Sequence, residues 1–288
     1  MLEYRAEGLC RNANHLSREE LSRCMASGEV LQSTALAYDT GHRLRFELGG
    51  LRGIMPFADC VDAAPGETVK DIAVLTRVGR PTCFVIMGTE FDENGEEYYL
   101  LSRAEAQRRC RAQYLDTLEA GSVIPCTVTH IENFGAFCDI GCGALGLLGT
   151  RRICMSRPAH AADCLRVGQR IFTAVRTLDP VQRRVTLTMR ELLGTWQENA
   201  ARFRAGQTVT GVVRTVTDYG TFIALTPNLC GLAETDGRLR PGQAVCVFIR
   251  AILPETLRIK LTVLHPLEAL PPQALAVSYT HLTLPTIL

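Results

Sequence analysis

The chain has 288 residues, with 47% hydrophobic and 21% charged side chains and a formal net charge of +1 at pH 7. This composition is ordinary for a globular protein, and no apolar run approaches the roughly 20 residues that a membrane-spanning helix requires. The 12 cysteines include no Cys-x-x-Cys pair, so neither a zinc site nor a disulfide framework is indicated. We therefore predict a cytoplasmic protein with no metal, no cofactor, no small-molecule substrate and no membrane contact.

The near-zero net charge conceals an uneven distribution along the chain. Residues 1–120 have 14 basic and 19 acidic side chains, residues 121–205 have 11 and 6, and residues 206–288 have 6 and 5. Only Lys70 and Lys260 are lysines, so the cationic groups are mainly guanidiniums, which suit phosphates and stack on flat rings. The excess positive charge lies in the middle of the chain.

The first part of the chain favours a helix followed by strands. Ser17 to Glu20 forms a capping-box pattern, which predicts a short helix over 17–25 within an N-terminal lead-in of residues 1–27. Apolar runs with strand composition then occupy 29–36, 44–48, 69–76, 83–87 and 98–101. Residues 103–118 lack Gly and Pro and place apolar side chains at helical spacing, which predicts a linker helix within 103–120.

The second half of the chain contains an internal repeat. Phe134-Gly135-Ala136-Phe137 in 121–190 corresponds to Tyr219-Gly220-Thr221-Phe222 in 206–265, and the opening glycines Gly28, Gly121 and Gly206 recur at intervals of 93 and 85 residues. Each copy has alternating apolar positions typical of strands. A second linker helix is predicted within 191–205, where apolar side chains repeat with helical spacing.

The repeated turn indicates a ring platform. A β-bulge at Gly135 would bring Phe134 and Phe137 onto one face of the sheet. Solvent-facing rings on a small barrel stack successive bases of a single strand, while arginines hold the phosphates. Candidate phosphate ligands are Arg151, Arg152, Arg176, Arg183, Arg184 and Arg190. The alternative is that Phe137 and Phe222 belong to the core and only Phe134 and Tyr219 are exposed.

The repeats resemble the S1-type RNA-binding domain of the ribosomal protein S1 family. In the middle repeat the resemblance rests on the Phe134–Phe137 turn, Asp139-Ile140-Gly141, Gly146-Leu147-Leu148, Val167-Gly168-Gln169 and Arg184-Val185-Thr186-Leu187. In the third it rests on the Tyr219–Phe222 turn, Gly231-Leu232, Pro241-Gly242-Gln243 and Arg258-Ile259-Lys260-Leu261. The linker Glu191–Asn199 resembles that of a clostridial-type bacterial branch of the family.

The resemblance implies an all-β fold of three tandem five-stranded OB-fold barrels joined by short α-helices, over 28–102, 121–190 and 206–265. It implies RNA-binding roles for Phe134, Phe137, Asp179 and Arg184, and for Tyr219, Phe222 and Arg258 in the third repeat. It also implies single-stranded RNA, including mRNA, and the 30S ribosomal subunit as partners in translation. No phosphate loop, zinc-protease helix or nucleophile elbow is present, which favours a non-enzymatic function.

The first repeat departs from this pattern. It has Thr40-Gly41-His42-Arg43 in place of the aromatic turn, and the net charge of −5 over residues 1–120 disfavours phosphate. We expect it to be structural or to contact protein. Two alternatives therefore stay open for the chain, namely a protein-interaction scaffold with degenerate barrels and the RNA-binding part of a larger RNA-processing protein. Residues 266–288 are expected to be an unstructured artefactual tail, because Ser278–Thr286 resembles translated sequencing-adapter sequence.

Overall fold

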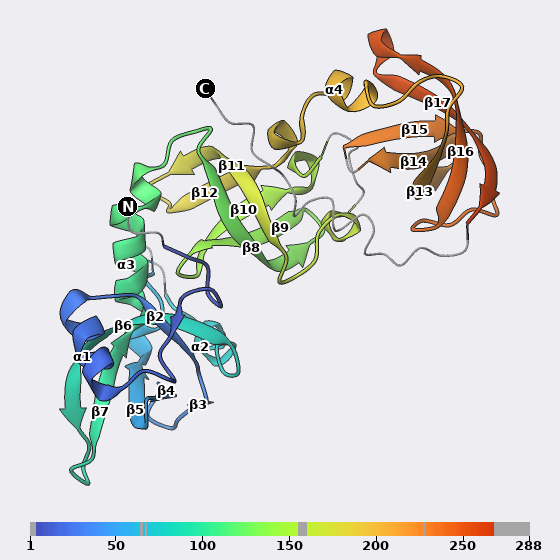
Figure 1. Ribbon diagram of the computed structural model, residues 1–288. Helices are drawn as coiled ribbons and strands as arrows, with labels where there is room; N and C mark the ends of the chain where they lie inside the picture. Colours follow the sequence, from blue (N-terminus) through green and yellow to red (C-terminus); the bar gives the residue numbers. More distant parts are fainter. Residues whose placement is uncertain (1–3, 64–65, 67, 155–159, 227, 268–288) are drawn as a thin grey trace. The chain divides into compact units, whose positions relative to one another are not determined.

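A computed structural model describes residues 4–63, 66, 68–154, 160–226 and 228–267. The described chain consists of one curled sheet and two closed barrels, with short helices between them (Figure 1). The predicted all-β class is thereby confirmed. The predicted tail lies outside the described residues, apart from Pro266 and Leu267.

The third repeat has the strand order of an OB-fold barrel. Its strands form a closed barrel in the order β13-β14-β15-β17-β16, in which β15 and β17 are parallel and the other neighbours are antiparallel. This is the five-stranded Greek-key arrangement of the OB-fold. The strands are β13 (Thr208–Thr217), β14 (Gly220–Thr226), β15 (Leu229–Ala233), β16 (Ala244–Leu253) and β17 (Arg258–Pro266).

The middle repeat closes in the same cyclic order, β10-β12-β11-β8-β9. Inward positions of its first strand alternate as Ile124, Cys126 and Val128, which are buried, as the period of two in a strand requires. The strands are β8 (Val123–Glu132), β9 (Gly135–Gly141), β10 (Ala144–Gly149), β11 (Arg170–Asp179) and β12 (Arg184–Thr188).

The first repeat is a seven-stranded sheet of order β1-β2-β6-β7-β5-β4-β3. Its five main strands follow the OB-fold order, with β5 and β7 parallel, and two-residue strands extend both edges. The sheet curls around a core that includes Leu44, Phe46, Phe84 and Tyr99. The strands are β1 (Arg11–Asn12), β2 (Leu31–Thr34), β3 (Ala37–Tyr38), β4 (Arg43–Leu48), β5 (Leu51–Pro56), β6 (Pro81–Phe91) and β7 (Glu97–Ser102).

The strand expected over 69–76 is wrong, because the chain forms helix α2 (Asp71–Leu75) there. This segment connects β5 to β6, which are not neighbours in the sheet, and it pairs with none of the described strands of the sheet. Val74 of this helix packs into the core, while Ile72 and Leu75 are exposed. Tertiary context thus overrides the β-propensity of the run.

Short helices precede and connect the sheets. Helix α1 (Arg18–Ser27) has the capping box at Ser17, with Glu20 donating its backbone N–H to Ser17 Oγ at 3.2 Å. Helix α3 (Arg103–Gln113) begins immediately after β7, and a single 3-10 turn (Leu115–Thr117) follows it. Helix α4 (Trp196–Ala200) is only five residues long, and Trp196 packs into the core of the third repeat. Among the described residues, no helix is long and apolar enough to cross a membrane.

A buried ionic cluster lies in the compact unit that combines the first repeat with residues 139–146 and 178–184. The Glu7 carboxylate accepts from Arg103 Nε at 2.6 Å and from Arg77 Nη1 at 2.5 Å. Burial alone would raise the pKa of Glu7, but the two guanidiniums outweigh it and hold that pKa below its usual range. Arg103 is itself only 4% exposed, so each charge depends on the other.

The same cluster fixes the turn between β9 and β10. Asp139 Oδ2 accepts the backbone N–H of Glu7 at 2.8 Å, and Oδ1 accepts those of Gly141 and Gly143 at 2.9 and 3.0 Å. Burial and the negative charge of Glu7 raise the pKa of Asp139 to about 6, despite these three donors. One end of strand β9, which also contains Phe137, is therefore held by backbone hydrogen bonds.

Candidate nucleic-acid interface

The aromatic turn of the middle repeat places two rings in contact. Phe134 lies in the turn before β9 and is 59% exposed, whereas Phe137 lies on β9 and is half-buried. Their ring centroids are 6.0 Å apart and the rings are nearly perpendicular, at 89°. This edge-to-face contact supports the outer ring from one side and leaves much of its surface in water.

Gly135 is required by a close approach of two strands. A Cβ built on it would lie 2.4 Å from the Leu148 carbonyl oxygen and 2.9 Å from Gly149 Cα, so any side chain would push the β10 backbone away. The turn is also anchored by the Thr150 backbone N–H, which donates to the Phe134 carbonyl at 3.0 Å. The aromatic-Gly-x-Phe pattern thus fixes the position of the exposed ring.

The third repeat reproduces this arrangement. Tyr219 is 73% exposed and contacts the half-buried Phe222 with a centroid distance of 5.9 Å and an interplanar angle of 82°. A Cβ on Gly220 would lie 2.8 Å from the Ala233 carbonyl oxygen, the same kind of close approach as in the middle repeat. Two independent copies of one local geometry argue against a chance surface contact.

A bulge at the motif glycine is not what joins the rings in the third repeat. The register of β13 against β14 is regular from Gly220, opposite Thr217, to Phe222, opposite Thr215, and shifts only after Phe222, between Thr215 and Val213. Tyr219 reaches Phe222 because it lies in the turn, where the alternation of strand faces does not apply. Phe134 and Tyr219 are exposed, as the alternative also expected, but Phe137 and Phe222 are half-buried and lie outside the buried core, so the placement of these two inner rings in the core does not describe them.

The predicted cationic residues occupy several places in the middle repeat. Arg151, Arg176 and Arg184 are exposed, on the 3-10 turn after β10, on β11 and at the start of β12 respectively. Arg152 is half-buried, with Nη1 at 3.8 Å from Glu191 Oε1. In the third repeat, exposed Arg258 opens β17.

Two other predicted residues have structural partners. Asp179 ends β11 and accepts the Gln182 backbone N–H at 2.9 Å, which stabilises the turn to β12. Arg183 in that turn donates from Nη1 to Asp62 Oδ2 at 2.8 Å and to the Ala63 carbonyl at 3.0 Å. Arg183 is therefore committed to the first compact unit, in contrast to the exposed arginines.

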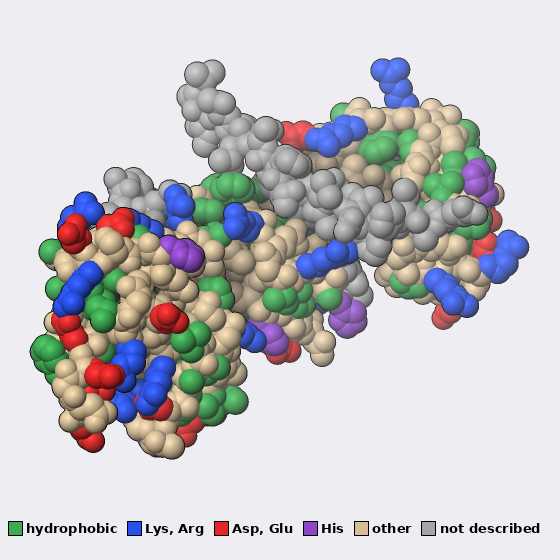
Figure 2. Space-filling view, turned by 60° about the horizontal axis from the view of Figure 1, so that its bottom comes forward, with side chains coloured by type: hydrophobic (Ala, Val, Ile, Leu, Met, Phe, Trp, Pro, Cys, Tyr) green, Lys and Arg blue, Asp and Glu red, His purple; other side chains and the backbone are tan. Residues whose placement is uncertain are grey.

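The first repeat has a ring pair that the sequence did not reveal. Tyr38 and His42 meet edge to face, with centroids 5.8 Å apart at 81°, and Tyr38 Oη lies 2.9 Å from His42 Nδ1. The sequence does contain a signal for this ring pair. Gly53-Ile54 aligns with Gly231-Leu232, and from this alignment the residues of the preceding strand and turn can be matched to those of the third repeat. Figure 2 shows acidic and basic side chains interleaved over the first repeat, at the left of the view.

The strand order and the repeated ring pairs define a tandem OB-fold protein. No family model matches the chain. Small ribosomal subunit protein bS1 of Neisseria meningitidis serogroup B is 35% identical over 228 residues, which are 78% of this chain and 38% of that protein. The bS1 protein of Streptococcus pneumoniae is 28% identical over 252 residues, 80% of this chain and 59% of that protein.

Among solved structures, a multidomain protein with nucleic acid binding domains from Streptococcus pneumoniae is 13% identical with a TM-score of 0.27, over 83% of this chain and 74% of that one. The resemblance of the chain to the ribosomal protein S1 family is thus confirmed by its curated relatives. The chain spans 38% and 59% of the length of the two relatives described above.

Proposed function

We propose that this chain is a non-enzymatic binder of single-stranded RNA, which acts in the cytoplasm on mRNA or on the small ribosomal subunit during translation. The observation that supports this most is the duplicated ring pair, in which an exposed outer ring is braced by a half-buried inner one. The curated relatives are small ribosomal subunit proteins, which supports the connection to translation.

Stacking supplies much of the proposed affinity. An aromatic side chain that stacks one base contributes about 1 to 3 kcal/mol, with little dependence on the base. Phe134 and Phe137 would receive bases in the middle repeat, and Tyr219 and Phe222 in the third. Because every base has a flat face, sequence preference is expected to be weak.

Phosphate contacts supply the rest of the proposed affinity for RNA, and they are expected mainly in the middle repeat. Residues 121–205 have a net charge of +5, and the exposed guanidiniums of Arg151, Arg176 and Arg184 have the fork geometry that phosphate accepts. Arg152 completes these cationic residues, and Arg258 is the counterpart of Arg184 in the third repeat. Asp179 belongs to the predicted RNA-binding residues, but its carboxylate would contact a base or a ribose hydroxyl and not a phosphate. The third repeat lies in residues 206–288, which have a net charge of only +1, and is expected to depend more on stacking.

Fluorescence anisotropy tests this function with labelled oligouridylate and with a duplex RNA of equal length, over a salt titration. Stacking requires unpaired bases, so we expect tighter binding of the single strand and a steep loss of affinity with salt. Equal affinity for the duplex would remove the stacking mechanism. Absence of binding at low salt would favour the protein-interaction scaffold.

A further inference from the structure

The strand registers show which residue of the first repeat takes the place of Phe222. In the third repeat, Phe222 on β14 lies opposite Leu232, which follows Gly231 on β15. In the first repeat, Arg45 on β4 lies opposite Ile54, which follows Gly53 on β5. Arg45 is exposed and its neighbours Leu44 and Phe46 are buried, so it points outward as Phe222 does.

The same registers identify the counterpart of Arg258. Leu232 pairs with Lys260 on the parallel strand β17, and Ile54 pairs with Leu100 on the parallel strand β7. Two residues earlier on each strand are Arg258 and Tyr98. Arg45 therefore takes the place of Phe222, and Tyr98 takes the place of Arg258. The outer face of the first repeat thus has one arginine and one aromatic residue at these two positions, on exchanged strands.

A third ring occupies the position of the outer aromatic. His42 precedes Arg45 by three residues, as Tyr219 precedes Phe222, and it is exposed while Tyr38 braces its edge. His42 has φ +57°, a left-handed conformation that only a minority of non-glycine residues adopt.

Asp39 holds both the turn and the two neighbouring arginines in place. Its Oδ1 accepts the backbone N–H groups of Gly41 and Arg43 at 3.0 and 3.1 Å, and its Oδ2 accepts Nε of Arg43 and of Arg45 at 3.2 and 3.1 Å. Burial alone would raise the pKa of Asp39, but hydrogen bonds from Arg45 and Arg43 hold it below its usual range. One carboxylate thus orients two guanidiniums, while Tyr98 on the same face donates its hydroxyl to Glu90 Oε2 at 2.6 Å.

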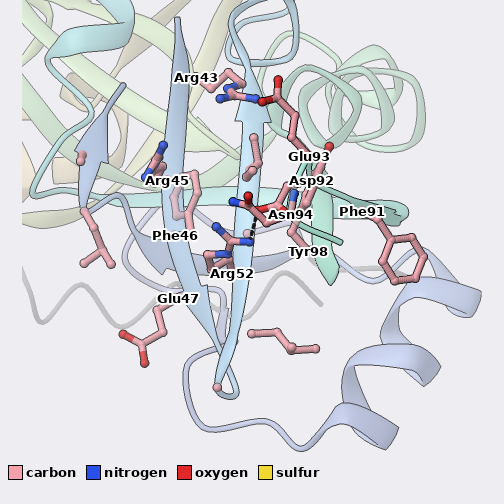
Figure 3. Close-up of a pocket in the computed structure, with 16 residues that line it drawn as sticks. Arg43, Arg45, Phe46, Glu47, Arg52, Phe91, Asp92, Glu93, Asn94 and Tyr98 are labelled. Atoms are coloured by element: carbon pink, nitrogen blue, oxygen red, sulfur yellow. Dashed lines mark hydrogen bonds and ion pairs between the residues drawn. The ribbon is translucent and has the colours of Figure 1, made fainter. Parts of the chain in front are cut away.

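These groups line a groove on the outer face of the sheet. Arg43, Arg45, Arg52 and Tyr98 belong to its lining, and Figure 3 shows the three arginines spaced along β4 and β5. Arg52 at the far end is neutralised by two carboxylates, with Nη2 at 2.6 Å from Asp92 and 2.8 Å from Glu96. Glu47, Asp92 and Glu93 also line the groove, so its lining is not cationic overall; Arg43 and Arg45, which share Asp39, are the guanidiniums that Asp92 and Glu96 do not neutralise.

We propose that the first repeat is a third contact for single-stranded RNA, at which Arg43 and Arg45 bind a backbone phosphate while His42 and Tyr98 stack bases. Asp39 is a positioning residue, since it orients the two guanidiniums and does not contact the ligand. This site is separate from the two ring platforms, and only the choice of RNA as ligand rests on the function proposed above. It replaces the expectation that the first repeat is structural or contacts protein.

Two substitutions in the full chain test the site. Arg45→Gln removes one phosphate ligand, so the slope of log affinity against log salt for labelled oligouridylate should fall by about 0.7. His42→Gly removes the ring and retains the left-handed backbone, because glycine adopts positive φ without strain. It should weaken binding about fivefold or more through lost stacking.

The matched control is Arg18→Gln, which removes an exposed, ion-paired arginine from helix α1 of the same repeat. It should leave both affinity and salt slope unchanged. The measurements are repeated in a chain that lacks all four platform rings, Phe134, Phe137, Tyr219 and Phe222. Residual binding there that is lost on adding Arg45→Gln would support the first-repeat site.

Two outcomes separate this proposal from the function proposed above. If Arg45→Gln and His42→Gly match Arg18→Gln in a wild-type background that binds RNA, the first-repeat site is refuted and the platforms stand. If removal of the four platform rings has no effect and Arg45→Gln does, the platforms are refuted and the first-repeat site stands. Thermal melts of each variant confirm that the chain remains folded.

Discussion

Truncation of Phe134 is expected to separate RNA binding from folding. Its side chain is 59% exposed, and full burial of a phenylalanine is worth about 1.5 to 3 kcal/mol, so Phe134→Ala should cost about 1 kcal/mol of folding free energy or less. A base stacked on this ring contributes about 1 to 3 kcal/mol. The dissociation constant for single-stranded RNA should therefore rise roughly five- to 150-fold.

The assay is anisotropy with labelled oligouridylate, with circular dichroism melts of the same samples. Val167→Ala is a matched control, because Val167 is an exposed apolar residue, 63% accessible, in the turn before β11 of the same barrel. Phe134→Ala combined with Phe137→Ala should weaken binding further. An RNA affinity within twofold of wild type for a folded Phe134→Ala variant would refute the stacking role.

Three further predictions concern the framework of these surfaces. Gly135→Ala should lower the free energy of unfolding by about 1 to 3 kcal/mol in urea titrations, whereas Gly149→Ala, whose added Cβ meets nothing closer than 4.0 Å, should have little effect. Glu7→Gln leaves the buried Arg103 without an anionic partner and should cost about 3 to 5 kcal/mol in the same titrations, and a loss below 1 kcal/mol would contradict the importance of that pair. Because the pKa of Asp139 is raised to about 6, its contribution to stability is complete below about pH 4 and is lost as the pH rises through about 6, by up to about 3 kcal/mol. Urea titrations across this pH range should show that Asp139→Asn removes this dependence, and an unchanged pH profile would contradict the assignment.

The sequence was sufficient for the parts of the fold that local signals encode. The capping box at Ser17 acts within three residues through a side-chain cap, and the motif glycines Gly135 and Gly220 allow a close approach to the next strand of the same hairpin. The all-β class followed from apolar alternation, as in β8. These features require no knowledge of distant contacts.

The remaining features depend on contacts that join distant parts of the chain. Residues 69–76 have strand composition but include helix α2, which buries Val74 in the core of the first repeat. The Glu7 and Asp139 contact joins residues 132 positions apart, and no periodicity signals such a pair. In the first repeat, the face of Arg45 and Tyr98 became visible only from strand registers, because the aromatic and basic residues had exchanged strands.

Photo-crosslinking of the full chain to RNA that contains 4-thiouridine, followed by peptide mass spectrometry, tests the central claim most directly. The platform account predicts crosslinks at Phe134 or Phe137 and at Tyr219 or Phe222, and competition by unlabelled single-stranded RNA should suppress them more than duplex RNA does. Crosslinks confined to peptides without these rings, or equal suppression by duplex RNA, would contradict it.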